Sequence, residues 1–312
     1  MNFSFIDEVF DPLQKKLVKR WVLELPGAGC EWYKRTGGCT MCGFNQSTYK
    51  YTFGGHLYPH FLFMLLFYYA YSLVKKEEPE VLVIYNGGSF LSDKEIPRRT
   101  QLAILDFVRH HPTLRKIMVE SRTEFATDEK LFDYKRAIGN KKLEIAFGLE
   151  SANDEVRNQC LKKGLSKKEF RRAVMEAKSL GFEVFAYVYL KPHCLDEEAA
   201  VLDAIESIKF CFNAKVDEVS LSCAFVQKGT HLYQLFQEGL FKPPTLRSII
   251  KVIKETANLG PVRIGSFDDE PPPIAKPSNM DSTDEKFLLA IDLYGRSHDV
   301  KVFEVLTPGP ID

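Results

Sequence analysis

The 312-residue sequence predicts an α/β fold: a partial (β/α)6 barrel of the TIM type with a small C-terminal α/β extension. Short runs rich in β-branched residues alternate with longer stretches of helical period. The short runs carry apolar residues on both faces, which is typical of strands in a parallel sheet with helices outside it. We expect the barrel core at residues 1–225 and an extension at residues 226–312 that completes or caps it.

The elements follow in chain order. The predicted strands of the barrel are residues 21–25, 81–85, 116–121, 143–149, 182–190 and 216–222. The helices between them are predicted near residues 61–77, 97–110, 128–138, 167–180 and 196–211, each ending close to a proline or glycine turn signal. Beyond residue 222 we predict helices near 230–239, 245–258 and 283–297, strands at 262–266 and 300–306, and a proline-rich linker at 268–277.

Charge and composition exclude several classes of protein. The 42 basic and 42 acidic residues cancel, so a globally basic nucleic-acid binder is not indicated. Seven cysteines, odd in number and unevenly spaced, are unlike a secreted disulfide framework and predict a reducing, cytoplasmic compartment. No signal peptide is expected in the first ten residues. The apolar run at 61–74 is shorter than a span of about 20 residues, so it predicts a buried core helix and no membrane association.

Three cysteines, Cys30, Cys39 and Cys42, directly follow the first predicted strand, at the end where parallel α/β folds bind ligands. Three interpretations compete. The thiols could form part of a zinc site completed by His56 or a distant cysteine, or they could simply occupy loop and core positions. They could also hold three irons of a [4Fe–4S] cluster, with one iron left without a protein ligand. The other motifs favour the cluster.

Three further segments lie after later strands. The second strand is followed by a glycine turn, whose backbone can approach a ligand closely, made of Asn86, Gly87, Gly88 and Ser89. Glu120 and Arg122 end the third strand, and Glu150 and Lys162 lie in "GLESANDEVRNQCLKKG" after the fourth. Taken singly, each segment also has a plain structural interpretation: an ordinary turn, an exposed ion pair or surface charge.

Together with Phe44 just after the last cysteine, these motifs resemble the radical S-adenosylmethionine superfamily over roughly residues 20–225, and its Elongator-like branch in particular. The commonest superfamily spacing has three residues between the first two cysteines, whereas this chain has eight. Wider first gaps are familiar in the Elongator-type branch. The departure therefore lengthens the loop without removing the resemblance.

The resemblance implies a site and a chemistry. Cys30, Cys39 and Cys42 would hold a [4Fe–4S] cluster, and S-adenosylmethionine would chelate the open iron. A one-electron donor of the flavodoxin or ferredoxin type would reduce the cluster, and the 5′-deoxyadenosyl radical released would abstract hydrogen from the substrate. The residues that would contact the cofactor are Phe44, Asn86, Gly87, Gly88, Ser89, Glu120, Arg122, Glu150 and Lys162. Tyr187 or Lys191 would border the adenine or the substrate.

Segments 189–207 and 222–253 resemble an archaeal group of Elongator-like proteins that includes an enzyme of archaeosine synthesis. This resemblance implies carbon–nitrogen cleavage of a lysyl adduct of deazaguanine in tRNA, together with a partner tRNA-modifying protein. Relatives tend to carry cysteines near the segment "KPSNMDSTDE", which has none here. The alternatives are a radical enzyme acting on another tRNA or a small molecule, and a zinc-binding adaptor without enzymatic activity.

The other four cysteines have less specific interpretations. Cys160, Cys211 and Cys223 are predicted to be small buried hydrophobic side chains. Cys194 follows the fifth strand, so it lies at the functional end and is a candidate to approach the substrate. The sequence gives no support for a metal ligand at the neighbouring His193.

Overall fold

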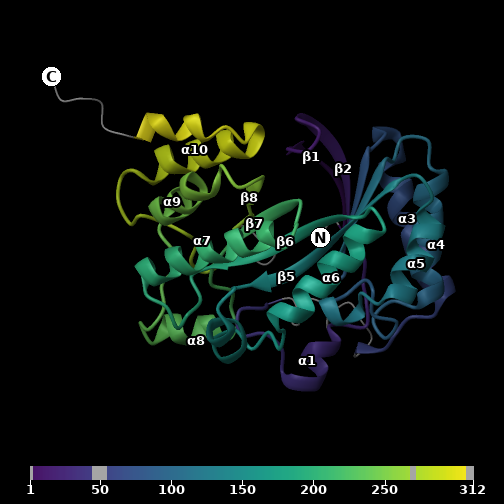
Figure 1. Cartoon of the computed structure of the whole chain (residues 1–312), viewed down its shortest axis with the longest axis horizontal. Coiled ribbons are helices and arrows are strands. Elements are labelled where there is room, and N and C mark those ends of the chain that lie inside the picture. Colours follow the sequence, from purple (N-terminus) through teal and green to yellow (C-terminus); the bar gives the residue numbers. More distant parts are fainter. Residues whose placement is uncertain (1–2, 44–54, 268–271, 307–312) are drawn as a thin grey trace. The chain divides into compact units, whose positions relative to one another are not determined.

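The computed structural model describes residues 3–43, 55–267 and 272–306, and in these ranges it contains an eight-stranded sheet whose strands follow chain order (Figure 1). Strands β2 to β5 pair in parallel, as do β7 and β8. The strands are β1 (Ser4–Asp11), β2 (Lys16–Glu24), β3 (Val81–Tyr85), β4 (Lys116–Ser121), β5 (Lys142–Glu150), β6 (Glu183–Leu190), β7 (Glu218–Cys223) and β8 (Val262–Ile264).

Helices separate the strands, and apart from the unpredicted short helix at 31–36 those between β2 and β7 lie where the sequence predicts them. Between β2 and β7 the α-helices are α1 (Glu31–Thr36), α3 (His60–Val74), α4 (Arg98–His110), α5 (Asp128–Ile138), α6 (Lys167–Ser179) and α7 (Glu197–Asn213). Later in the chain they are α8 (His231–Gln237), α9 (Leu246–Thr256) and α10 (Asp284–Ser297). Short 3₁₀ turns lie at η2 (Lys75–Glu77), η3 (Thr123–Phe125) and η5 (Val300–Leu306), and η4 (Val156–Cys160) is a π-helical turn.

The chain divides into two compact units. The first comprises Met1–Val9, Leu17–Gly148 and Leu165–Phe185, and the second comprises Phe10–Lys16, Leu149–Gly164 and Ala186–Asp312. Strands β5 and β6 each run from the first unit into the second. The predicted boundary at residue 225 stays a prediction.

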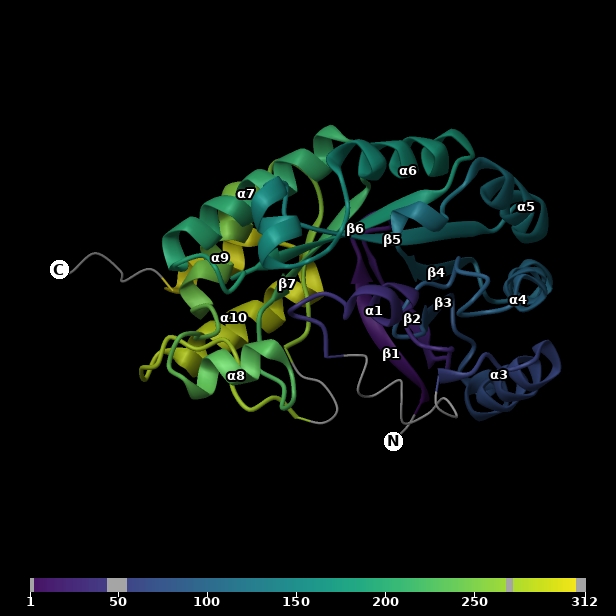
Figure 2. The same ribbon diagram turned by 90° about the horizontal axis from the view of Figure 1, so that it is seen from below.

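In the first unit, helices α3, α4 and α5 line one side of strands β2 to β4 (Figures 1 and 2). The core between them is aromatic: the Trp21 ring lies 5.3 Å from Phe67, and Phe67 lies 5.0 Å from Phe107. Trp21 and Phe67 are fully buried. Strand β3, with the sequence VLVIY, carries no charged residue, and this is the pattern that predicts a strand covered on both faces.

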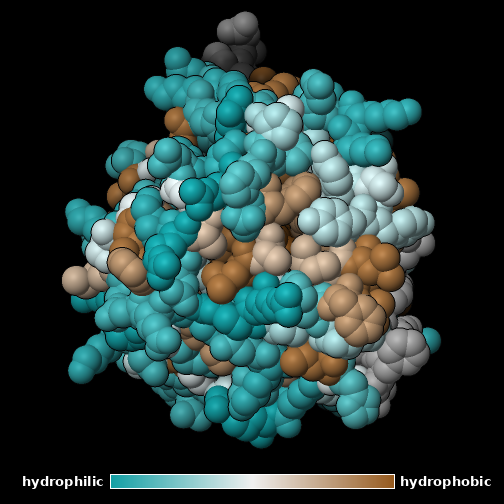
Figure 3. Space-filling model, turned by 90° about the vertical axis from the view of Figure 1, so that its right-hand side faces the viewer, coloured by the Kyte–Doolittle hydropathy of each residue, from teal (hydrophilic) through white to brown (hydrophobic). Residues whose placement is uncertain are grey.

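Helix α3 is the apolar run that the sequence places in the core, but only one of its faces is buried. Figure 3 faces the side of the molecule where α3, α4 and α5 lie, and hydrophobic side chains interrupt its hydrophilic surface. Phe63, Phe67, Ala70 and Val74 are buried. The exposed side chains of the helix include Phe61, Leu65, Tyr68, Tyr69 and Leu73. Among the described residues, no helix has the length and apolarity that crossing a membrane requires.

In the second unit, α9 lies between α7 and α10 in both ribbon views (Figures 1 and 2). Leu246, Ile249 and Ile253 of α9 are buried, and they recur at helical spacing. The Tyr294 hydroxyl of α10 donates a hydrogen bond to the Val262 carbonyl of β8 at 2.6 Å. These contacts attach the later helices to the last strands of the sheet.

Two local predictions differ from the structure. Residues 300–306, predicted as a strand because apolar and polar side chains alternate, form the 3₁₀ helix η5, in which only Phe303 is buried among the described side chains. Strand β1, which pairs with β2, was not predicted. The predicted α/β class, with sequential strands and intervening helices, is confirmed.

Candidate cluster and cofactor site

The loop after β2 carries the three cysteines, and the eight residues between Cys30 and Cys39 have a defined structure. Cys30 is the N-cap of α1, a helix of six residues that ends at Gly37. Gly37 and Gly38 both adopt left-handed backbone conformations, with φ of 87° and 84°. A Cβ on Gly38 would lie 2.6 Å from the Tyr33 ring, so the tight return of the chain toward Cys39 requires glycine there. The wide cysteine spacing is therefore taken up by one short helix and a glycine turn.

The described part of this loop contains all three cysteines. The Cys42 amide donates a hydrogen bond to the Cys39 carbonyl at 3.2 Å. Burial raises the pKa of the Cys30 thiol, with further contributions from the Glu95 carboxylate and from Cys39. Across the described ranges, no three His, Cys, Asp or Glu side chains are already gathered closely enough to hold a metal ion. Phe44 lies outside the described residues.

The glycine turn after β3 packs directly against the first cysteine. A Cβ on Gly88 would lie 3.2 Å from the Cys30 Cα and only 1.9 Å from the Glu95 Oε2. Glycine at this position therefore permits a close approach that any side chain would prevent. Cys30 and Gly88, predicted from separate motifs, are brought together in the first unit.

Glu95 links these two segments and is a residue that sequence reasoning missed. Its carboxylate accepts hydrogen bonds from the backbone amides of Glu31, at 3.0 Å, and Ser89. Its own carbonyl accepts from the Ala28 amide at 3.2 Å. The side chain is 1% exposed, and burial raises its pKa to about 7. The only available signal is an acidic residue a few positions after the glycine turn, which is too common a pattern to single out.

The end of β4 joins the same group. The Arg122 amide donates to the Ser89 hydroxyl at 3.1 Å, and the Arg122 guanidinium stacks over the Trp32 ring of α1 at 4.4 Å from its centroid. Arg122 forms its ion pair with Glu124, at 2.6 Å. The Glu120 carbonyl accepts from the Phe90 amide at 2.8 Å. Arg122 therefore ties the cysteine loop to the glycine turn.

The residues of the first unit fit a small ligand with an ammonium group. Asn86 is buried, and its Oδ1 has no hydrogen-bond partner within the described parts of the chain. Leaving a buried acceptor unpaired is costly, and a ligand donor would satisfy it. Three cysteines, a glycine-lined backbone and an unpaired acceptor are suitable groups for an iron–sulfur cluster and an amino-acid cofactor.

Glu150 and Lys162 lie in the second unit. Glu150, at the end of β5, is buried and adopts a left-handed conformation with φ of 66°. Its Oε1 lies 2.7 Å from the Nζ of Lys163, whereas Lys162 is exposed. Lys163 is therefore a further residue that the sequence did not distinguish from its neighbour, because either lysine of the pair could turn inward.

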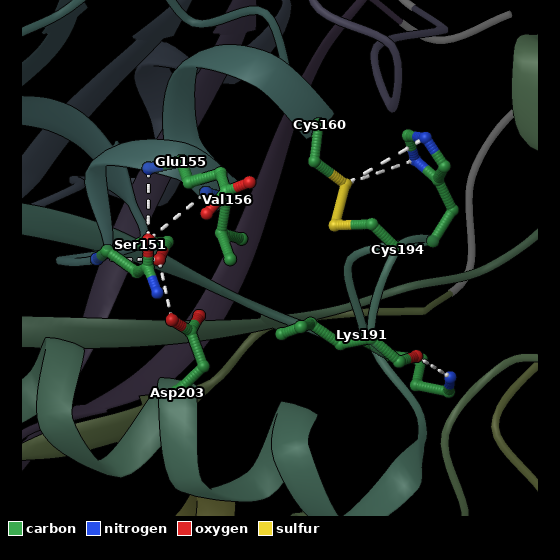
Figure 4. Close-up of a disulfide and its surroundings, with 10 residues drawn as sticks. Ser151, Glu155, Val156, Cys160, Lys191, Cys194 and Asp203 are labelled. Atoms are coloured by element: carbon green, nitrogen blue, oxygen red, sulfur yellow. Dashed lines mark hydrogen bonds between the residues drawn. A yellow bond between two sulfur atoms is a disulfide. The ribbon is translucent and has the colours of Figure 1, made fainter.

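The segment after Glu150 is fixed by buried polar contacts. The Ser151 hydroxyl donates to Asp203 Oδ1 at 2.7 Å (Figure 4). The Ala152 amide donates to the Ser207 hydroxyl at 2.7 Å. Arg157 is fully buried and donates to the Ser151 carbonyl at 2.8 Å. Burial raises the pKa of Asp203 to about 6. These contacts hold the segment against α7.

Lys191 and Cys194 follow β6 (Figure 4). The Lys191 Nζ donates to the Leu195 carbonyl, and burial lowers the pKa of this lysine. Cys194 forms a disulfide with Cys160, so the interpretation of Cys160 as a plain buried hydrophobe is wrong. Cys211 and Cys223 are buried as predicted, and burial raises the pKa of both thiols. Tyr187 is half-buried on β6.

The chain is similar in sequence to a protein whose name is curated. The chain is 35% identical over 230 residues to archaeosine synthase subunit beta of Methanosarcina acetivorans. The match covers 73% of this chain and 64% of the relative, so the chain spans somewhat less than two thirds of that protein's length. No protein-family model matches the chain.

Two solved structures share the fold. Methylornithine synthase (PylB) matches with a TM-score of 0.52 at 15% identity, covering 90% of this chain and 84% of that one. The archaeal Elp3 of Methanocaldococcus infernus matches with a TM-score of 0.50 at 17% identity, covering 73% and 58%. The similarity to archaeosine synthase subunit beta and the fold shared with these two structures agree with the resemblance that the cysteine and glycine motifs carry.

Proposed function

We propose that this protein is a radical S-adenosylmethionine enzyme that modifies tRNA. Its reaction would be the carbon–nitrogen cleavage of a lysyl-deazaguanine adduct that forms archaeosine. The observation that carries the enzymatic part is the contact of the Cys30 loop with the Gly88 turn, with the Glu95 carboxylate bonded to both. This contact brings the first cysteine of the loop beside the glycine turn, and a cluster-bound amino-acid cofactor would need both segments.

Each predicted residue would have a definite role. Cys30, Cys39 and Cys42 would ligate a [4Fe–4S] cluster. Asn86 Oδ1 would accept from the cofactor ammonium, and the backbone of Gly87 and Gly88 would line its amino-acid end. When bound, the cluster and S-adenosylmethionine supply one-electron cleavage to a carbon radical that abstracts hydrogen from the substrate.

The other residues of the chain would position this chemistry. Arg122 and Trp32 would keep the cysteine loop in place, and Glu95 would hold the loop and the turn at a fixed spacing. Glu150, paired with Lys163, would present a carboxylate toward the cofactor ribose, and Lys162 would contact the cofactor carboxylate. Phe44 would shield the cluster from water.

The tRNA substrate follows from the relative's name, archaeosine synthase subunit beta. The word subunit supports a partner protein for this chain as well. Such a partner would supply the basic surface for tRNA, because the chain itself carries equal numbers of acidic and basic residues. We also propose that a flavodoxin- or ferredoxin-type protein donates the electron and that the protein is cytoplasmic.

The experiment that tests the substrate is anaerobic incubation with tRNA carrying the lysyl-deazaguanine adduct, with S-adenosylmethionine and a reductant. Nucleoside mass spectrometry should detect archaeosine together with 5′-deoxyadenosine, and a Cys39→Ala variant should form neither. Formation of 5′-deoxyadenosine without archaeosine would contradict the proposed substrate but not the proposed radical cleavage of S-adenosylmethionine. A colourless protein that binds stoichiometric zinc at the three cysteines would instead support the adaptor.

A further inference from the structure

We propose that Cys160, Cys194 and His193 form a second metal site, for a thiophilic divalent cation of the Zn²⁺ class, when the disulfide between the two cysteines is reduced. His231 would be the fourth ligand. All four residues lie in the second unit and none belongs to the Cys30 loop. This metal site can therefore be tested independently of the cluster.

Cys194 and His193 both contact the Cys160 sulfur, and His231 lies beside His193, so reduction of the disulfide would have to bring the four side chains together. Cys160 and Cys194 are bonded to each other, with their Cα atoms 6.1 Å apart (Figure 4). The His193 ring nitrogens lie 3.7 Å and 3.8 Å from the Cys160 Sγ. The His231 ring centroid lies 5.1 Å from that of His193. Two thiolates and two imidazoles are a ligand set that structural zinc sites use.

The backbone around these residues is already ordered by hydrogen bonds. Cys160 ends the π-helical turn η4, which the Leu161 amide closes on the Val156 carbonyl at 2.9 Å. His193 and Cys194 lie in a turn that the Leu195 amide closes on the Pro192 carbonyl at 3.0 Å. In this turn two adjacent side chains both reach Cys160. Cys194 and His231 are exposed, which gives a cation a path from solvent.

The chemistry balances with a dithiol as the reductant. The dithiol breaks the Cys160–Cys194 bond and becomes a disulfide itself, and each cysteine sulfur gains one electron and one proton. A cation that binds the reduced pair displaces both protons, because thiolates are the ligands. While the two sulfurs are bonded to each other they cannot act in this way, so the site exists in the reduced state alone.

The test uses the full chain with Cys30, Cys39 and Cys42 replaced by serine, so that the cluster loop binds no metal. The protein is reduced with a dithiol, desalted under anaerobic conditions and titrated with Co²⁺, whose thiolate charge-transfer absorption reports sulfur ligation. We expect one Co²⁺ per reduced chain, displaced by Zn²⁺, and none in the oxidised chain. Cys194→Ser should weaken binding by more than the roughly 10–100-fold that loss of an outer-shell partner costs, and His193→Ala should weaken it by at least about 10-fold.

The matched control is Cys211→Ser, which removes a buried thiol of the same unit, in α7, and should leave cobalt binding unchanged. Because Cys194 is exposed, its substitution should not disturb the fold, and circular dichroism of each variant checks this. Equal cobalt binding by the parent and Cys194→Ser would overturn the site. Unchanged affinity in His193→Ala would overturn the assignment of the histidine, leaving only a dithiol.

Discussion

The absence of a side chain at residue 88 decides how closely the glycine turn approaches Cys30. The Glu95 carboxylate occupies the position of the missing Cβ and is fixed there by the Glu31 and Ser89 amides. Glu95 cannot move aside without leaving these buried donors unpaired, and unpaired buried groups are costly.

Gly88→Ala should therefore destabilise the first unit and impair cluster assembly. Overpacking of this kind typically costs about 1–3 kcal/mol of unfolding free energy. Urea denaturation measures this loss, and iron analysis after anaerobic reconstitution measures the cluster. The matched control is Gly295→Ala in α10, where an added Cβ meets nothing within 4 Å and should leave both values unchanged or slightly raise stability. Full cluster content in Gly88→Ala would contradict the role given to this contact.

Asp203 should make stability depend on pH. Burial raises its pKa from 3.8 to about 6, so the native state binds more protons than the unfolded state between these values. The free energy of unfolding therefore falls as pH rises through this window, by roughly 2–3 kcal/mol from this group. Asp203→Asn should reduce the fall by this amount, since an amide oxygen still accepts from Ser151, whereas Glu95, whose pKa burial raises to about 7, keeps its own contribution.

Denaturant titrations between about pH 4 and 7 measure this difference between the wild-type protein and the variant. Asp292→Asn, an exposed change on α10, serves as the control and should keep the wild-type pH dependence. If Asp203→Asn shows the same fall in stability as the wild type, the raised pKa of Asp203 is contradicted.

The sequence predicts part of the site at the residue scale. Cys30 and Gly88 can be singled out because each follows a strand and carries a recognisable pattern. Glu95 cannot, since its role depends on the fold of a turn that ends six positions before it. The disulfide pairs residues separated by 34 positions, and only the sheet brings the loops after β5 and β6 together.

At the scale of elements, α1 is the spacer that makes the wide cysteine gap possible. Its Trp32 ring is contacted from outside by Arg122 of the segment after β4 and from within by Arg35 of α1 itself. Only the first of these contacts joins two elements. A cation–π contact of this kind contributes about 0.5–2 kcal/mol.

Arg122→Gln should therefore loosen the cysteine loop, whereas Arg35→Gln should not. Hydrogen–deuterium exchange of residues 31–36 should be faster in the first variant, by a local opening free energy lower by about 0.5–2 kcal/mol. Equal exchange in the two variants would show that the stacking on Trp32 does not anchor α1.

Elements were predictable where burial determines them. Strands β3 and β4 are buried on both faces, and α9 repeats buried residues at helical spacing, so their patterns are unambiguous. Residues 300–306 alternate like a strand but form a 3₁₀ helix against α10, where Tyr294 stacks on Phe303 at 5.2 Å. A short alternating run does not reveal whether a strand partner is within reach.

At the scale of the whole molecule, the α/β class and strand order follow from the alternation of elements, and the curated relative agrees with the motifs. The sequence alone could not show that the site residues lie together, because they come from the loops after β2, β3 and β4. In parallel folds such loops meet at one edge of the sheet, which explains why scattered motifs form one site.

The central claim is that the three cysteines hold a cluster with one iron open to S-adenosylmethionine. Electron paramagnetic resonance of the anaerobically reconstituted, dithionite-reduced protein tests it most directly. We expect a [4Fe–4S]⁺ signal that changes when S-adenosylmethionine is added, with release of 5′-deoxyadenosine, and we expect loss of both in Cys39→Ala. A cluster signal that is unaffected by S-adenosylmethionine, or that persists fully in Cys39→Ala, would contradict it.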